Sequence, residues 1–355
     1  MGGLLSIVKK IWHHKGLCFG GIFIFIAVLI ALFAYVLAPD NTTDANRMTI
    51  EIGGKKPGYK QMFFKQKKSE QPPQSIVYKW LYGRDDAFEW IPIVAYRQNG
   101  DTVIIDKFID EGVSEQKSFQ LNGSRANTLI EEKTFLLGTD KFGRDILSRL
   151  LIGTRISLSV GAIAVLVSLT IGIFLGAMAG YWGGKTDRLI MWFVQVVWSL
   201  PTLLLVFGVM LLLGKGFWQV FLAIGLSLWV NVARLVRGQV MSVKKMAYVE
   251  AAAVMGFSHF RILFLHILPN IMSSVWVMAA ANFATAIMLE AGLSFLGIGI
   301  PAPQPSWGLM MKEHYSFIIT QNPALALAPG IVIAVTVFAF HLIGNGLRDL
   351  LDVRA

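Results

Sequence analysis

Six long apolar segments, separated by polar stretches, constrain this chain more than any other feature of its sequence. A helix that crosses the roughly 30 Å hydrocarbon core of a bilayer needs about 20 apolar residues, and it satisfies its backbone hydrogen bonds internally. The composition agrees, because 55% of the residues are hydrophobic and only 15% are charged. We therefore expect an all-α polytopic membrane protein with six transmembrane helices. The predicted spans are 17–37, 156–179, 189–213, 217–236, 271–295 and 324–343.

The first apolar segment follows several lysines, as in a secretory signal peptide. However, it is longer than the usual apolar region of about 7–15 residues. In addition, Pro39 directly follows Ala38, the best candidate for a cleavage site. We expect residues 1–38 to form a cytoplasmic N-terminus and an uncleaved anchor helix.

The basic residues of the short loops predict the orientation of the chain. Cytoplasmic loops carry an excess of Lys and Arg. The loops on the N-terminal side of the membrane are rich in these residues, whereas the opposite short loops offer Lys215 and Lys312. We expect both termini to be cytoplasmic in a multi-pass protein of the inner membrane. The basic residues on the N-terminal side are Lys185, Arg188, Arg237, Lys244, Lys245, Arg261, Arg348 and Arg354.

A polar segment, 39–141, separates the first two predicted spans. It contains stretches of β-branched and aromatic residues at 75–80, 90–96 and 102–108, and the sequence 98–101 is typical of a hairpin turn. We expect a small β-rich extracytoplasmic insert. A disordered loop is the alternative, because the 60–74 stretch is polar and contains prolines.

The net charge of +10 does not indicate binding to nucleic acid. Lys and Arg are scattered through loops and the insert, without a basic helix or an aromatic platform beside them. Cys18 is the only cysteine, so the chain cannot form a disulfide framework or a cysteine-based metal site. The expected solvent and partner is a lipid membrane.

The loop between the fourth and fifth predicted spans, 237–270, is expected to form two short helices joined by a turn. Glu250 is followed by three alanines, which are small enough to let one helix approach another surface closely, and Gly256 permits the turn. Pro269 suits the first turn of the fifth span. An apolar stripe at helical spacing follows the turn and consists of Phe257, Phe260, Leu263 and Phe264.

This loop resembles the EAA motif of ABC importer permeases, which reads Glu-Ala-Ala, three residues, Gly, nine residues, Ile-x-Leu-Pro. The residues that match are Glu250, Ala251, Ala252, Gly256, Leu268 and Pro269. His266 stands where the general pattern has Ile, and this departure resembles the oligopeptide, dipeptide and nickel branch, in which His-Ile-Leu-Pro-Asn is usual. The resemblance to that branch continues at 137–145, 180–184, 293–299 and 346–349.

The resemblance implies a permease subunit that forms half of the translocation pore of an ATP-driven peptide importer, with nickel or another small solute as the alternative cargo. The implied partners are a second permease subunit in a heterodimer, two ATPase subunits that hold ATP and Mg²⁺, and an extracytoplasmic solute-binding protein. The 250–256 helix would dock in a groove of an ATPase and transmit its closure to the spans.

Polar residues inside the predicted spans are candidates for the pore or for packing. Glu290 is a costly carboxylate in the fifth span, and Asn282 lies on roughly the same helical face. Substrate contact, solvation near the interface and hydrogen bonds within the bundle all remain open for them. Pro201 is expected to kink the third span. Glycines that suit close helix approach in the second span are Gly161, Gly172, Gly176 and Gly180.

No motif predicts catalysis or a bound cofactor. Lys185 and Thr186 resemble the end of a phosphate-binding loop, but Ala179 stands where its first Gly is required. The six histidines form no His-Glu-x-x-His pattern, and we expect no metal on this chain. An ion-driven secondary transporter, and a membrane-bound enzyme or scaffold that works through its insert, are the alternative functions. The EAA-like loop argues against both.

Overall fold

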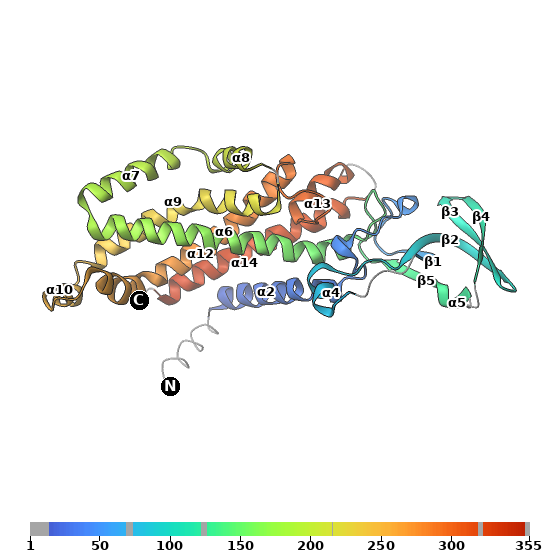
Figure 1. Cartoon of the computed structure of the whole chain (residues 1–355), viewed down its shortest axis with the longest axis horizontal. Coiled ribbons are helices and arrows are strands. Elements are labelled where there is room, and N and C mark those ends of the chain that lie inside the picture. The colour runs from blue at the N-terminus through green and yellow to red at the C-terminus, as the bar shows by residue number, and fades with distance from the viewer. Residues whose placement is uncertain (1–13, 69–73, 122–125, 215, 319–321, 352–355) are drawn as a thin grey trace, which may run out of the picture. The chain divides into compact units, whose positions relative to one another are not determined.

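The structure is a computed structural model that describes residues 14–68, 74–121, 126–214, 216–318 and 322–351 (Figure 1). The first thirteen residues of the predicted cytoplasmic N-terminus, together with Lys215 and Arg354, lie outside the described residues. The chain divides into two compact units. One unit comprises Met1–Val28, Ser157–Pro301 and Val332–Ala355, and the other comprises Leu29–Ile156 and Ala302–Ile331.

Long apolar helices dominate the first unit. Within the described residues, five helical stretches are long and apolar enough to cross a membrane. They are α2 (Lys15–Leu32), α6 (Ile146–Trp182), α9 (Phe217–Val243), the run His259–Leu296, and α14 (Ala324–Leu351). The run His259–Leu296 contains α11 (His259–Arg261), a π-helical stretch η3 (Ile262–Ile267) and α12 (Leu268–Leu296).

The third predicted span is two helices instead of one kinked helix. α7 (Gly184–Trp198) and α8 (Thr202–Leu213) are bent by 95° at the break between them. Pro201 lies in this break and cannot donate a backbone hydrogen bond to it. The predicted kink is thus at the predicted place, but the turn is close to a right angle. The pair counts as a sixth span only if both helices belong to one crossing.

Glycines allow α6 to approach α9 at backbone distance, as predicted for the second span. A Cβ atom added to Gly172 would lie 2.5 Å from Cβ of Val232, and one added to Gly176 would lie 2.5 Å from the carbonyl oxygen of Ala233. Gly180 continues this stripe one turn later. Helices in lipid associate mainly through such close packing, because the surrounding lipid is as apolar as the side chains.

Helix α2 packs on α14 in the same way. A Cβ atom at Gly20 would lie 2.6 Å from the carbonyl oxygen of Ala339, and one at Gly346 would lie 2.7 Å from Cβ of Leu17. His14 Nε2 also lies 3.0 Å from a carboxylate oxygen of Asp349. The first and last described helices of the chain are therefore held together.

A five-stranded antiparallel sheet lies in the second unit, between the first two long helices. Its spatial order is β4-β3-β2-β1-β5 (Figure 1). The strands are β1 (Tyr59–Lys67), β2 (Phe88–Asn99), β3 (Thr102–Asp110), β4 (Val113–Gln120) and β5 (Ile130–Phe135). The two-residue turn between β2 and β3 contains Gly100 at a φ of 63°, so the hairpin predicted at 98–101 is present.

Each face of the sheet contributes to a buried core. Phe64, Ile93 and Ile105 belong to a core on one face, whereas the adjacent Phe63 packs with Phe108 in a core on the other. Adjacent residues of a strand point to opposite faces, so one strand can supply both cores. β1, which covers part of the stretch 60–74, is paired with β2 on one side and with β5 on the other.

The strand predicted at 75–80 is wrong, because this stretch belongs to helix α4 (Ile76–Tyr82). The hydroxyl of Ser75 accepts a hydrogen bond from the backbone N–H of Tyr78 and caps the helix. Gly83, at a φ of 86°, ends it. The shorter elements of the second unit are α3 (Ala34–Leu37), η1 (Thr43–Ala45), η2 (Ile50–Ile52), α5 (Ala126–Leu129), α13 (Trp307–His314) and η4 (Tyr315–Ile318).

Gly176→Ala should destabilise the helical unit, because the new methyl group would collide with the backbone of α9. We expect a loss of about 1–3 kcal/mol, measured by thermal unfolding of the purified chain in detergent. Gly238→Ala is the matched control on α9, since no atom lies within 4 Å of its added Cβ. Equal melting temperatures for the two variants would contradict the close α6–α9 contact.

Candidate functional site

The predicted loop 237–270 begins later than expected, because residues 237–243 belong to α9. Helix α10 (Ala247–Val254) follows and carries Glu250, Ala251 and Ala252. We call residues 244–267 the coupling segment. Ala252 is buried within the first unit, whereas Glu250 and Ala251 are exposed.

Gly256 makes the turn that ends α10. Its φ of 80° is in the left-handed region, which glycine adopts without strain. Its N–H donates to the carbonyl of Ala253, and the N–H of Phe257 donates to that of Ala252. These bonds satisfy carbonyls that would otherwise be unpaired at the helix end. The next helix begins at His259, with the Ser258 hydroxyl as its cap.

The second helix of the coupling segment is continuous with the fifth predicted span. It runs from α11 through η3 into α12, where Pro269 occupies the first turn as predicted. Leu268 is half-buried, and the ring of His266 stacks on Phe257 at a centroid distance of 5.9 Å. Stretches of π-helix are rare and frequently lie at functional sites.

The apolar stripe predicted on this helix divides between two faces. Leu263 is buried and Phe257 is half-buried, whereas Phe260 and Phe264 are exposed. We call a set of large, exposed apolar side chains of this segment the coupling patch. It consists of Val254, Met255, Phe260, Phe264 and Leu265.

Glu290 and Asn282 are both buried within the first unit. The Ser294 hydroxyl donates to Oε1 of Glu290 at 2.7 Å, one turn along the same helix. Nδ2 of Asn282 donates to the hydroxyl of Ser168 on α6 at 3.3 Å. Both side chains are buried and make hydrogen bonds within the first unit. Pro201, by contrast, is exposed at the break between α7 and α8.

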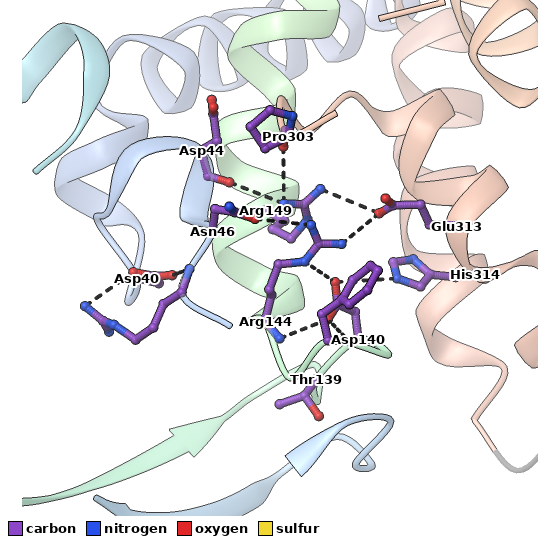
Figure 2. Close-up of polar contacts among 12 residues, drawn as sticks. Asp40, Asp44, Asn46, Thr139, Asp140, Arg144, Arg149, Pro303, Glu313 and His314 are labelled. Atoms are coloured by element: carbon purple, nitrogen blue, oxygen red, sulfur yellow. Dashed lines mark hydrogen bonds and ion pairs between the residues drawn. The ribbon is translucent and has the colours of Figure 1, made fainter. Parts of the chain in front are cut away.

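A buried cluster of ion pairs lies in the second unit, where the loop before α6 meets α13 (Figure 2). Nε of Arg144 donates to Oδ2 of Asp140 at 2.5 Å, and Nη2 of Arg144 donates to Oε2 of Glu313 at 2.9 Å. Nη2 of Arg149 lies 3.6 Å from the same Glu313 oxygen. The two guanidinium groups and the two carboxylates balance in charge, as buried ions must.

Backbone groups fix the geometry of this cluster. Oδ1 of Asp140 accepts hydrogen bonds from the N–H groups of Phe142 and Arg144, at 2.8 and 2.9 Å. Nη1 of Arg149 lies within 3.5 Å of the carbonyl oxygens of Asp44 and Pro303 (Figure 2). Four of these contacts join three segments of the second unit that are distant in sequence: those of Arg144 and Arg149 with Glu313, and those of Arg149 with Asp44 and Pro303.

Asp140, Glu313 and His314 also bring potential metal-ligand atoms within 4.8 Å of one another. Arg144, however, is already bonded to both carboxylates. Burial, as the largest cause, lowers the pKa of His314 to about 4, so this imidazole is neutral at pH 7. A divalent cation would have to displace Arg144 and would leave the cluster with excess positive charge. We therefore interpret these residues as a structural ion-pair cluster.

Sequence reasoning missed this cluster. Asp140 and Arg144 belong to the stretch 137–145 that carries part of the family resemblance, but Arg149, Glu313 and His314 were not singled out. Two arginines at the start of an apolar helix were the available signal, because charges there require partners. The sequence does not indicate that the partner is Glu313, which lies 169 residues from Arg144.

Glu313→Gln should destabilise the chain strongly, because it leaves two buried guanidinium groups without their shared carboxylate. We expect a loss of about 3–5 kcal/mol, seen as a lower melting temperature in detergent. Glu111→Gln is the control, since the Glu111 side chain is 83% exposed in its pair with Lys55. It should cost less than about 1 kcal/mol. A similarly small effect of Glu313→Gln would contradict the role of the cluster.

Comparison with known proteins assigns the family. Residues 172–355 match the family described as binding-protein-dependent transport system inner membrane component. The oligopeptide transport system permease protein OppC of Bacillus subtilis is 41% identical over 220 residues, which cover 62% of this chain and 72% of that protein. The glutathione transport system permease protein GsiD of Pectobacterium atrosepticum is 44% identical over 216 residues, 61% of this chain and 71% of that protein.

A third relative, the dipeptide transport system permease protein DppC of Bacillus subtilis, is 40% identical over 215 residues, which cover 61% of this chain and 67% of that protein. The long apolar helices of the structure agree with a multi-pass membrane protein. The matching region includes α9, the coupling segment and α12. This chain therefore belongs to the family of binding-protein-dependent transport system inner membrane components, the permease subunits of ABC importers.

Proposed function

We propose that this chain is one of two permease subunits of an ATP-driven importer that carries peptides across the inner membrane. The three relatives named above are permeases for oligopeptides, glutathione and dipeptides, and this supports a peptide as cargo. Nickel or another small solute is the alternative cargo. The remaining subunits would be a second permease, two ATPases that bind ATP and Mg²⁺, and an extracytoplasmic solute-binding protein.

The coupling patch is the observation that supports an ATPase partner most directly. Val254 and Met255 are 89% and 66% exposed at the end of α10. The charged side chains of Lys245 and Arg261 are exposed on the same segment, as expected at the aqueous edge of a membrane. An apolar surface in water typically marks a site of protein–protein contact. Glu250, Ala251 and Gly256 are exposed beside it and would face the same partner.

The orientation follows from the charges of the loops and from the number of crossings. Five crossings would place the two termini on opposite sides of the membrane. The distribution of Lys and Arg favours termini on the same, cytoplasmic side. We therefore propose that α7 and α8 together cross the membrane once, which gives six spans. The sheet β1–β5 is then extracytoplasmic and the coupling segment is cytoplasmic.

Glu290 and Asn282 are proposed as packing residues of the pore-forming bundle. Their hydrogen bonds to Ser294 and Ser168 support this role over direct contact with the cargo. The break at Pro201 exposes the ends of α7 and α8 and would suit contact with the second permease. The proposed transport function does not depend on these polar residues or on the break at Pro201. It depends on the family and on the coupling patch.

Val254→Asp should prevent binding of the ATPase subunits without unfolding the chain, because this side chain is almost fully exposed. When the tagged chain is purified from membranes in mild detergent, we expect the ATPase subunits to co-purify with the wild type but not with this variant. Ile76→Asp is the matched control, since Ile76 is 85% exposed on α4, in the insert. If Val254→Asp retains the ATPases as well as this control does, the coupling patch is not their docking site.

Cysteine labelling in intact cells tests the orientation. Glu111→Cys, in the turn between β3 and β4, should react with a membrane-impermeant maleimide added from outside. Met255→Cys should react only after the membrane is permeabilised, because it lies on the coupling segment. Both side chains are well exposed, so accessibility within the protein does not limit either reaction. Labelling of Met255→Cys from outside would overturn the proposed topology.

A further inference from the structure

The end of α6 makes polar contacts with the coupling segment that the family match does not explain. The hydroxyl of Tyr181, in the last turn of α6, lies 2.9 Å from Nδ1 of His259. Tyr181 is only 6% exposed, and its ring meets the His259 imidazole edge-on at 5.7 Å between centroids. A tyrosine hydroxyl is protonated at neutral pH, with an ordinary pKa of about 10. It can therefore donate to a neutral imidazole.

Lys244, the first residue of the coupling segment, contacts the same tyrosine. Its ammonium group donates to the backbone carbonyl of Tyr181 at 2.6 Å and lies 5.1 Å from the centre of the tyrosine ring. Carbonyl groups in the last turn of a helix have no partner within that helix. A cation there both satisfies such a carbonyl and interacts favourably with the helix dipole.

Lys244 and His259 are the residues that flank α10 and its turn, one on each side. Both contact Tyr181, so a single residue of α6 is bonded to the chain before and after the helix that carries Glu250. We call Tyr181, Lys244 and His259 the Tyr181 cluster. The neighbouring Trp182 adds an edge-on contact with Phe260 at 6.4 Å between centroids.

Apolar packing makes this attachment stiff. Tyr181 belongs to a buried core that also contains Val249 and Ala252 of α10 and Ile262 of η3. Close-packed interiors transmit displacement instead of absorbing it. Glycine contacts hold the same end of α6 against α9, at Gly176 and Gly180. Movement of α10 therefore has a short, continuous path into α6.

We propose that Tyr181 is a positioning residue that transmits the movement of the coupling helix α10 into α6, in addition to α9 and α12, to which α10 is connected along the chain. This inference rests on the proposed function, because it assumes that an ATPase subunit moves α10. It assigns a role to the Gly-Tyr-Trp-Gly-Gly stretch at 180–184, which does not belong to the coupling patch.

Tyr181→Phe tests the cluster in the purified full-length chain, because it keeps the ring and removes only the hydroxyl. Trypsin cleaves after Lys245 and Arg261 when the coupling segment opens locally. We expect cleavage at these sites to be about fivefold faster than in the wild type in both Tyr181→Phe and His259→Leu. The double variant should be cleaved no faster than either single variant, because both substitutions remove the same hydrogen bond. Thr170→Val is the matched control, since the Thr170 hydroxyl donates to the carbonyl of Leu166 within α6. Unchanged cleavage in Tyr181→Phe would overturn the attachment.

The second measurement uses the importer reconstituted with its ATPases, second permease and binding protein, and radiolabelled trialanine as probe. We expect Tyr181→Phe to retain its ATPases and to hydrolyse ATP, but to import several-fold less trialanine per ATP. His259→Gln, which keeps a hydrogen-bonding group, should recover part of the loss seen in His259→Leu. A wild-type ratio in Tyr181→Phe would overturn transmission through α6. A wild-type complex that hydrolyses ATP but imports no trialanine would instead contradict the proposed cargo, while the cleavage rates still decide the attachment.

Discussion

The backbone contact between α6 and α9 is the interaction on which the helical unit depends. In lipid, apolar side chains gain little by leaving their surroundings, so helix association requires close and complementary surfaces. Gly172, Gly176 and Gly180 provide such a surface along one side of α6. α9 is the most buried of the candidate spans, and its C-terminal end leads directly into the coupling segment. Any partner that moves this segment therefore acts on the best-packed part of the unit.

Features set by local physics could be predicted from the sequence. The lengths of the apolar segments located the long helices, because the thickness of a bilayer fixes how many residues a crossing helix needs. Gly256 was recognised as a turn and Pro269 as a first-turn residue, since few other residues suit these positions. The hairpin at 98–101 and the glycine stripe of α6 were recognised for the same reason. Each depends on a few adjacent or regularly spaced residues.

Features that depend on distant residues could not be predicted. The ion-pair cluster joins Asp140 and Arg144 to Glu313, and nothing near either residue identifies the other. The strands β1, β4 and β5 are polar along much of their length, so their own composition does not predict strands. Pairing with neighbouring strands of the sheet stabilises them. At 75–80, aromatic and β-branched residues suggested a strand, but the capping bonds of Ser75 and the turn at Gly83 select a helix. The 95° break at Pro201 exceeds what a proline alone requires.

The first and last strands of the insert are neighbours in the sheet. Tyr59 at the start of β1 pairs with Phe135 at the end of β5, so the chain leaves and returns at adjacent positions. Partners in an antiparallel pair lie about 5 Å apart. A domain attached in this way behaves as a module, because the number of residues in it can change without changing the distance between its first and last strands. Evolution could enlarge, exchange or remove such a module between the first two long helices while the segments that flank it keep their spacing. Permeases of one family could thereby acquire different domains at this position of the chain.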